Sequence, residues 1–150
     1  MARRWAVAAA LVCLAQTGAA RNACEVLTKK DLDFASTKLS QSTREQLAIS
    51  QCFYQAPAFA NSVSLTLITG SDTALNGYWK GDASQEDQDI RTVEVDGVGD
   101  EALWSGNRIN GALYVRTRGA ILRISPGGAG DTQAKIDRSK SLAKLALKRL

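Results

Sequence analysis

Histidine is absent from the 150 residues of this sequence. Its absence excludes Ser-His-Asp and Cys-His nucleophile systems and histidine metal sites, because each needs an imidazole as base or ligand. Cysteine is scarce: there are three, and none forms the Cys-x-x-Cys spacing of a redox motif. Any catalysis would have to rely on carboxylates, and we expect a protein that is not an enzyme and holds no cofactor or metal.

Long apolar runs are missing as well. Residues 5–14 are apolar and uncharged, but a membrane-spanning helix needs roughly 20 such residues. Two arginines at 3–4 precede this run and small residues at 17–20 follow it, which is typical of a secretory signal peptide. We therefore expect residues 1–20 to be a signal peptide cleaved after Ala20, or one residue earlier. The alternative is an ordinary buried N-terminal helix.

A lipobox is also lacking. Val12 precedes Cys13, where a small residue is needed, and Arg21 stands three positions before Cys24, where a leucine-like residue is needed. Lipidation is therefore not expected, and the mature chain contains no predicted transmembrane segment. The expected location is the periplasm or the exterior of the cell.

Loss of the signal peptide removes two arginines and no acid, so the formal net charge falls from +4 to +2. The basic balance thus belongs partly to the signal, and binding of nucleic acid is not expected. Residues 21–150 are enough for a single secreted domain. The two remaining cysteines, Cys24 and Cys52, are expected to form a structural disulfide, with a redox-active pair as the alternative.

The mature chain alternates between predicted helices and strands. Thr28 and Asp31 fit a capping box for a helix within 24–35, Ser71 fits the start of a short helix that presents Leu75, Tyr78 and Trp79 to a core, and residues 36–46 are predicted as loop. Residues 81–89 form an acidic loop. The hydrophobic pattern predicts strands at 47–55, 62–69, 90–95, 101–105, 112–117 and 120–125. The expected fold class is α+β: an antiparallel sheet of about five to six strands with helices packed on it and an amphipathic C-terminal helix.

The last two strands are predicted to form a hairpin around Arg118 and Gly119. A two-residue loop makes one face apolar and places Tyr114 opposite Arg123, where a cation–π contact can form. A three-residue loop would instead pair Leu113 with Arg123. We prefer the first register, and regard Tyr114 and Arg123 as candidate ligand contacts. Its pairs are Thr117 with Ala120, Val115 with Leu122, and Leu113 with Ile124.

The C-terminal helix is predicted from Asp131 to Leu150. Its apolar stripe comprises Ile136, Ser139, Ala143, Ala146 and Leu150, with Leu142 and Leu147 beside it. Its remaining surface is basic and contains Lys135, Arg138, Lys140, Lys144, Lys148 and Arg149. We expect a solvated face, which suits the negative end of the helix dipole. The alternative is a surface for anionic lipid or polymer.

The segment GVGDEA at 97–102 matches a variant of the dinucleotide-binding fingerprint. The residues that follow do not resemble a helix, no acid occurs between Glu101 and Asp131 to bind a ribose, and two carboxylates would repel a pyrophosphate. We therefore predict a structural turn. In it Gly97 and Gly99 supply the backbone conformations, and the Asp100 side chain closes the turn. Ala102 and Trp104 then share one face of the next strand.

Several of these segments also resemble a group of bacterial secreted proteins and lipoproteins of unknown function. The segments are ACEVLTKKDL, QCFY, VDGVGDEALW and ALYVRTRGAILRIS, followed by an Ala/Leu-rich helix. The resemblance implies the fold of the photosystem PsbP-like family, an antiparallel sheet with helices packed on it, and implies no established activity. The lack of a lipobox departs from the lipoprotein members. The matching residues are Cys24, Leu27, Thr28, Cys52, Gly97, Gly99, Asp100, Glu101, Ala102 and Trp104.

These observations favour a non-catalytic binding or assembly module of the cell envelope, with an envelope protein or a small ligand as its partner. Two other functions stay open. One is a small-ligand-binding protein that uses a cleft near Trp104 and Tyr114. The other is a carboxylate-dependent hydrolase that uses Asp100 and Glu101.

Overall fold

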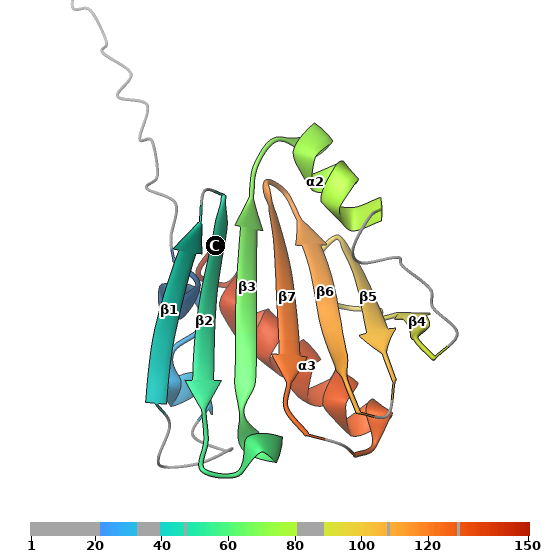
Figure 1. Ribbon diagram of the computed structural model, residues 1–150. Coiled ribbons are helices and arrows are strands. Elements are labelled where there is room, and N and C mark those ends of the chain that lie inside the picture. The colour runs from blue at the N-terminus through green and yellow to red at the C-terminus, as the bar shows by residue number, and fades with distance from the viewer. Residues whose placement is uncertain (1–21, 33–39, 47, 81–88, 108, 129) are drawn as a thin grey trace, which may run out of the picture.

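The computed structural model describes residues 22–32, 40–46, 48–80, 89–107, 109–128 and 130–150, and of residues 44–46 the backbone alone (Figure 1). The predicted signal peptide and almost all of the acidic loop lie outside these ranges. The fold is α+β, with a seven-stranded antiparallel sheet in the order β1-β2-β3-β7-β6-β5-β4. The strands are β1 (Ser40–Gln46), β2 (Ile49–Gln55), β3 (Val63–Thr69), β4 (Arg91–Glu94), β5 (Glu101–Gly106), β6 (Gly111–Thr117) and β7 (Ala120–Pro126).

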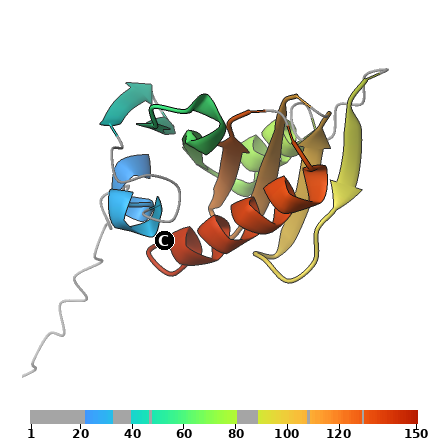
Figure 2. The ribbon, with the colours of Figure 1, turned by 90° about the horizontal axis from the view of Figure 1, so that it is seen from below.

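The helices are short except for the last one. They are α1 (Ala23–Val26), α2 (Asp72–Tyr78) and α3 (Thr132–Leu147), with 3₁₀ turns η1 (Lys29–Leu32) and η2 (Phe59–Asn61). In the described part of the chain α1, η1 and α3 cover one face of the sheet, which we call the helix face, and α2 lies on the opposite face (Figure 2). We call that opposite face the open face, because α2 covers only one end of it.

Strand β1 corrects the prediction of a loop over residues 36–46. Its sequence, SQSTREQ, contains no apolar residue and therefore gives no alternating signal. It forms the edge of the sheet and pairs with β2 along its whole length, from Ser40 opposite Gln55 to Gln46 opposite Ile49. A strand held by backbone pairing at an edge does not need an apolar face, which is why the sheet has one strand more than the six predicted ranges.

The helix predicted to follow Thr28 is the 3₁₀ turn η1 over its described residues, and the short helix α1 that precedes it was not predicted. Asn22 caps α1 and forms a reciprocal capping box with Glu25, whereas Leu27 leaves the helix in an extended conformation. The predicted Thr28–Asp31 pair is present at η1: the backbone N–H and the hydroxyl of Thr28 both donate to the Asp31 carboxylate, at 2.7 and 2.9 Å. This second cap starts a separate 3₁₀ turn, so α1 and η1 do not form one continuous helix.

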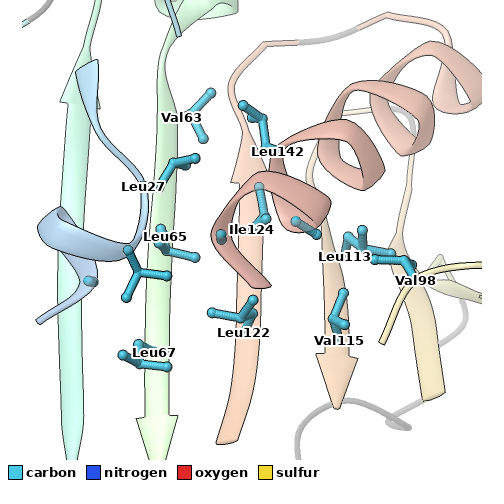
Figure 3. Close-up of a cluster of buried hydrophobic side chains, with 14 of the residues drawn as sticks. Leu27, Val63, Leu65, Leu67, Val98, Leu113, Val115, Leu122, Ile124 and Leu142 are labelled. Atoms are coloured by element: carbon cyan, nitrogen blue, oxygen red, sulfur yellow. The ribbon is translucent and has the colours of Figure 1, made fainter. Parts of the chain in front are cut away.

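The hydrophobic core lies between the helix face and α3 (Figure 3). Leu65, Leu113, Leu122 and Ile124 contribute from the central strands, Leu142 contributes from α3, and all five are fully buried. Each such side chain stabilises the fold by roughly 1.5–3 kcal/mol. The predicted stripe of α3 is confirmed at Ile136, Ser139, Ala143 and Ala146, whereas Leu150 lies beyond the helix end and is 46% exposed.

The predicted hairpin register of β6 and β7 is confirmed at every pair, including Tyr114 opposite Arg123. At the α2 end of the open face, Leu75 and Trp79 pack on Ile68 and Ile121, as predicted for the helix that Ser71 caps. Because successive side chains of β7 point to opposite faces of the sheet, Leu122 lies in the main core and its neighbour Arg123 lies on the open face.

Three links fix the N-terminal segment to the helix face. The predicted disulfide joins Cys24 of α1 to Cys52 of β2. Tyr54 donates from its hydroxyl to the Leu27 carbonyl, and burial raises the pKa of that hydroxyl above its usual range. Near the C-terminus, Arg149 donates to both carboxylate oxygens of Asp31, at 2.7 and 2.9 Å. This bidentate pair holds the pKa of Asp31 at about 2, despite burial acting in the opposite direction.

Candidate functional site

The GVGDEA segment is a turn that leads directly into a strand. Gly97 and Gly99 have φ values of 75° and 63°, and β5 begins at Glu101, so no helix follows the glycines. A side chain at Gly99 would meet Val115 Cγ1 at 2.4 Å and the Arg116 carbonyl oxygen at 2.7 Å. The segment therefore has the backbone of a tight turn against β6 and lacks the helix of a dinucleotide loop.

The contacts of the two acids of this segment, Asp100 and Glu101, are structural. The Asp100 backbone N–H donates to the Arg116 carbonyl at 2.9 Å, while its exposed side chain makes no hydrogen bond to the described residues, so the predicted side-chain closure is wrong. Glu101 lies 3.9 Å from Arg116 in an exposed ion pair. Neither acid lines any of the three hollows described below, and their arrangement gives no support to hydrolase chemistry.

Trp104 and Tyr114 do not share a cleft. Trp104 is 1% exposed and belongs to the main core with Ala102, as predicted, whereas Tyr114 points to the open face. Trp104 lines a hollow of about 760 Å³ between β4, β5 and the start of α3, and its indole N–H has no partner among the described groups. Among its described lining residues are one acid and one base, Asp89 and Arg91, both exposed, and their charges balance.

A second hollow, of about 510 Å³, lies on the open face at the end that α2 leaves uncovered. Its floor is a row of aligned residues on four neighbouring strands: Ser42 pairs with Phe53, Phe53 with Ser64, and Ser64 with Ser125. Three of these four side chains are serines, which are too small to fill the surface of the sheet. The Ser125 hydroxyl oxygen is buried and has no hydrogen-bond partner among the described groups.

Arg123 supplies the charge of this second hollow, which we call the Arg123 hollow. Its Nε donates to the Tyr114 hydroxyl at 3.0 Å, and its guanidinium carbon lies 5.6 Å from the centre of the Tyr114 ring, so the predicted cation–π pair is present. Its two terminal nitrogens make no hydrogen bond to described residues, and no acid is among the residues that line the hollow. Arg123 also lines a smaller neighbouring hollow of about 280 Å³, together with Tyr114.

Exposed apolar side chains surround the Arg123 hollow. Phe53, Phe59 and Ile109 are 39%, 72% and 65% exposed, and all three line it. They are three of the five large apolar side chains exposed in the described part of the chain. Such a concentration around one concave surface is typical of a binding site rather than of scattered surface residues.

The loops that carry this rim are fixed from the other side of the sheet by α3. Lys135 is buried and donates from Nζ to the Ile109 carbonyl at 3.2 Å. Arg138 donates to the Ala60 and Asn61 carbonyls of η2, which carries Phe59, at 3.3 and 3.0 Å. Arg149, as described above, binds Asp31. Three of the six cations that were predicted to form a solvated basic face therefore hold other segments in place.

The backbone segments that carry the rim also lie close to one another. A side chain on Gly127 would meet the Phe59 carbonyl oxygen at 2.2 Å, and Gly127 itself donates to the Ser62 carbonyl at 2.8 Å. Across the hollow, the Asn107 side chain accepts from the backbone N–H groups of Ile109 and Asn110, at 2.9 and 2.8 Å, which shapes the turn between β5 and β6. Both walls are therefore positioned without a ligand.

Within the described ranges, no cluster of three or more cysteine or acidic residues could hold a metal ion, and no helix has the length and apolarity needed to cross a bilayer. Comparison of the chain with protein-family models, with curated proteins and with solved structures finds no match.

The Arg123 hollow was found only in part from the sequence. Tyr114 and Arg123 were candidate contacts, whereas the serine row and the apolar rim were missed. A signal existed in the strand sequences: Ser64, Arg123 and Ser125 occupy the non-core phase of strands whose other phase is wholly apolar.

Proposed function

We propose that this protein is an exported, non-catalytic binding module of the cell envelope, and that it holds a small ligand in the Arg123 hollow. The observation that carries the proposal is a positioned guanidinium with no acidic partner among the described residues, in a concave surface rimmed by exposed aromatic and aliphatic side chains. A cation that is fixed before a ligand arrives favours binding, because little ordering is needed on association. The Cys24–Cys52 disulfide supports export, since such bonds persist in oxidising compartments.

Binding is favoured over catalysis because the hollow lacks the parts of a reaction centre. The chain has no histidine to act as a base, and the hydroxyls of Ser64 and Ser125 have no carboxylate beside them among the residues that line the hollow. The resemblance to the secreted PsbP-like proteins stays a prediction.

A fragment screen followed by two-dimensional NMR of the ¹⁵N-labelled, exported protein tests the proposal. We expect the binding fragments to shift the amide signals of Ser64, Thr66, Arg123 and Ser125, which lie side by side on β3 and β7. Arg123→Gln should abolish these shifts. The matched control is Arg118→Gln, which removes an exposed arginine from the turn of the same hairpin.

Two results would refute the proposal. One is a screen in which no fragment perturbs the Arg123 hollow. The other is a set of fragments that perturb only the residues around Trp104 on the opposite face.

A further inference from the structure

We infer that the ligand of the Arg123 hollow is an amphiphile with a single carboxylate, bound with the carboxylate at Arg123 and its apolar part between Phe59 and Ile109. This inference rests on the proposed function and adds the chemical class and the orientation of the ligand.

The carboxylate head group is inferred from the hydrogen bonds that the Arg123 guanidinium makes and from those it can still make. The Nε of Arg123 already donates to Tyr114, and the adjacent ring restricts the plane of the group. The two terminal nitrogens are left, and their parallel N–H groups match the two oxygens of a carboxylate. Ser125 adds a hydroxyl whose oxygen has no partner among the described groups.

The charge of the ligand follows from the charge of its site. Arg123 is the one cation among the described residues that line the hollow, and none of these residues is an acid. A ligand with a single negative charge neutralises this group, whereas a polyanion would keep unpaired charge and a cation would be repelled. A neutral ligand would cover Arg123 without supplying a counter-charge, and hydrogen bonds between ionised partners are the stronger ones.

The apolar part follows from the rim. Phe59 on η2 and Ile109 in the turn between β5 and β6 stand on the two sides of the hollow, at the strand ends farthest from α2 (Figure 1). Arg123 lies further along the face, opposite Thr66 on one side and Tyr114 on the other. The charged group and the apolar groups therefore lie at opposite ends of the hollow. The volume of about 510 Å³ lies within the range of roughly 300–1,000 Å³ that is usual for small-molecule sites.

Titration calorimetry with chain-matched probes tests this inference on the exported protein. The probes are decanoate, decanol, decyl sulfate, decyltrimethylammonium and acetate, each below the concentration at which it forms micelles. We expect decanoate to bind at least ~10-fold more tightly than decanol and than decyltrimethylammonium, because a charge-assisted bidentate pair is worth a factor of about that size. Decyl sulfate should bind more weakly than decanoate, and acetate should give no measurable heat.

Two variants, each with a matched control, test which residue contacts the carboxylate of the probe and which contacts its apolar chain. Arg123→Gln should weaken decanoate binding by ~10-fold or more and leave decanol unchanged, whereas Arg118→Gln should change neither. Phe59→Ser should weaken decanoate and decanol alike. Its control is Leu150→Ser, which alters another exposed apolar residue outside the hollow.

Equal binding of decanoate and decanol, tighter binding of decyl sulfate, or no effect of Arg123→Gln on decanoate would each overturn the carboxylate assignment. If the NMR screen still places fragments in the Arg123 hollow, the proposed function survives that result. If no probe binds and no fragment perturbs the hollow, both fail.

Discussion

The two faces of the sheet use their side chains in different ways. On the helix face, the inward residues of β3, β6 and β7 are leucine, valine and isoleucine that pack against α1 and α3, and nearly all are fully buried. On the open face, apolar packing is limited to the patch beneath α2. The rest of that face presents Gln51, Phe53, Thr66, Arg123 and three serines.

Under the proposed function, stability and binding belong to different faces of the sheet. Packing on the helix face supplies most of the burial that holds the sheet together, so the open face can keep a hollow and an unneutralised cation. The two faces are nevertheless connected, because Lys135 and Arg138 of α3 hold the loops that form the rim. We expect substitutions on the two faces to separate into stability effects and binding effects.

The largest effect is expected from removing a core side chain on the helix face. Leu122→Ala should lower the free energy of unfolding by about 3–4 kcal/mol, because the residue is fully buried and leaves a cavity. Ser125→Ala, on the open face of the same strand, should change it by less than ~0.5 kcal/mol, because its hydroxyl makes no hydrogen bond to the described residues. Urea unfolding measures both. Similar losses in the two variants would contradict the separation of the faces.

The disulfide gives the next effect. Cys24 and Cys52 are 28 positions apart, and closing such a loop stabilises a fold by about 3.5 kcal/mol in the chain-entropy model. Cys52→Ala should cost that amount and leave the open face intact, since Cys52 lies on the helix face. Thermal melts measure the loss, and alkylation without reduction should label no thiol in the unmodified exported protein. Two alkylated cysteines there would disprove the structural bond.

The turn of GVGDEA should be less costly to alter. Gly99→Ala combines a positive φ with contacts of 2.4 and 2.7 Å, so we expect a loss of about 2 kcal/mol or more. Gly119→Ala is the matched control: its φ is 79°, but no atom lies within 4 Å of the added methyl group, so the loss should be about 1 kcal/mol. Equal melting temperatures for the two variants would show that β6 does not restrict the turn.

A smaller effect on stability is expected when the pH is lowered. The pKa of Asp31 is about 2 in the folded protein, below its ordinary value of 3.8, because Arg149 donates to the carboxylate. A lowered pKa means that this stabilisation is present above about pH 4 and is lost as the pH falls towards 2. Since Arg149 is partly exposed to water, we expect the pair to contribute only about 1 kcal/mol. Arg149→Gln should reduce stability at pH 6 by that amount and flatten its loss between about pH 4 and pH 2. Identical pH profiles with and without Arg149 would rule the pair out as a source of acid sensitivity.

The comparison of the faces also explains what the sequence could predict. Alternation of apolar residues located six strands, and separation of the faces chose the register that pairs Tyr114 with Arg123, because both are local patterns. Strand β1 was missed because an edge strand without apolar residues has no such pattern. The hollow was missed because Phe53, Ser64 and Ser125 meet only through the strand order, which places β7 beside β3.

The basic residues of α3 show a second limit of local patterns. On a helical projection Arg138 faces away from the apolar stripe and looks solvated, whereas Lys135 lies at the edge of the stripe beside Leu142. In the folded protein they donate to backbone carbonyls of Ile109, Ala60 and Asn61, which are 26 to 78 positions away in the chain. Long basic side chains can reach such distant acceptors, and no spacing rule within the helix reveals them.

The most direct test uses the neighbouring residues Leu122 and Arg123, which point to opposite faces of β7. Thermal melts and decanoate titrations are measured on Leu122→Ala and Arg123→Gln, with the titrations at a temperature where circular dichroism shows both to be folded. We predict that Leu122→Ala lowers the melting temperature and keeps binding within ~3-fold of the unmodified protein, whereas Arg123→Gln keeps the melting temperature and weakens binding by ~10-fold or more. The account is contradicted if Arg123→Gln unfolds the protein as readily as Leu122→Ala, or if it leaves decanoate binding unchanged.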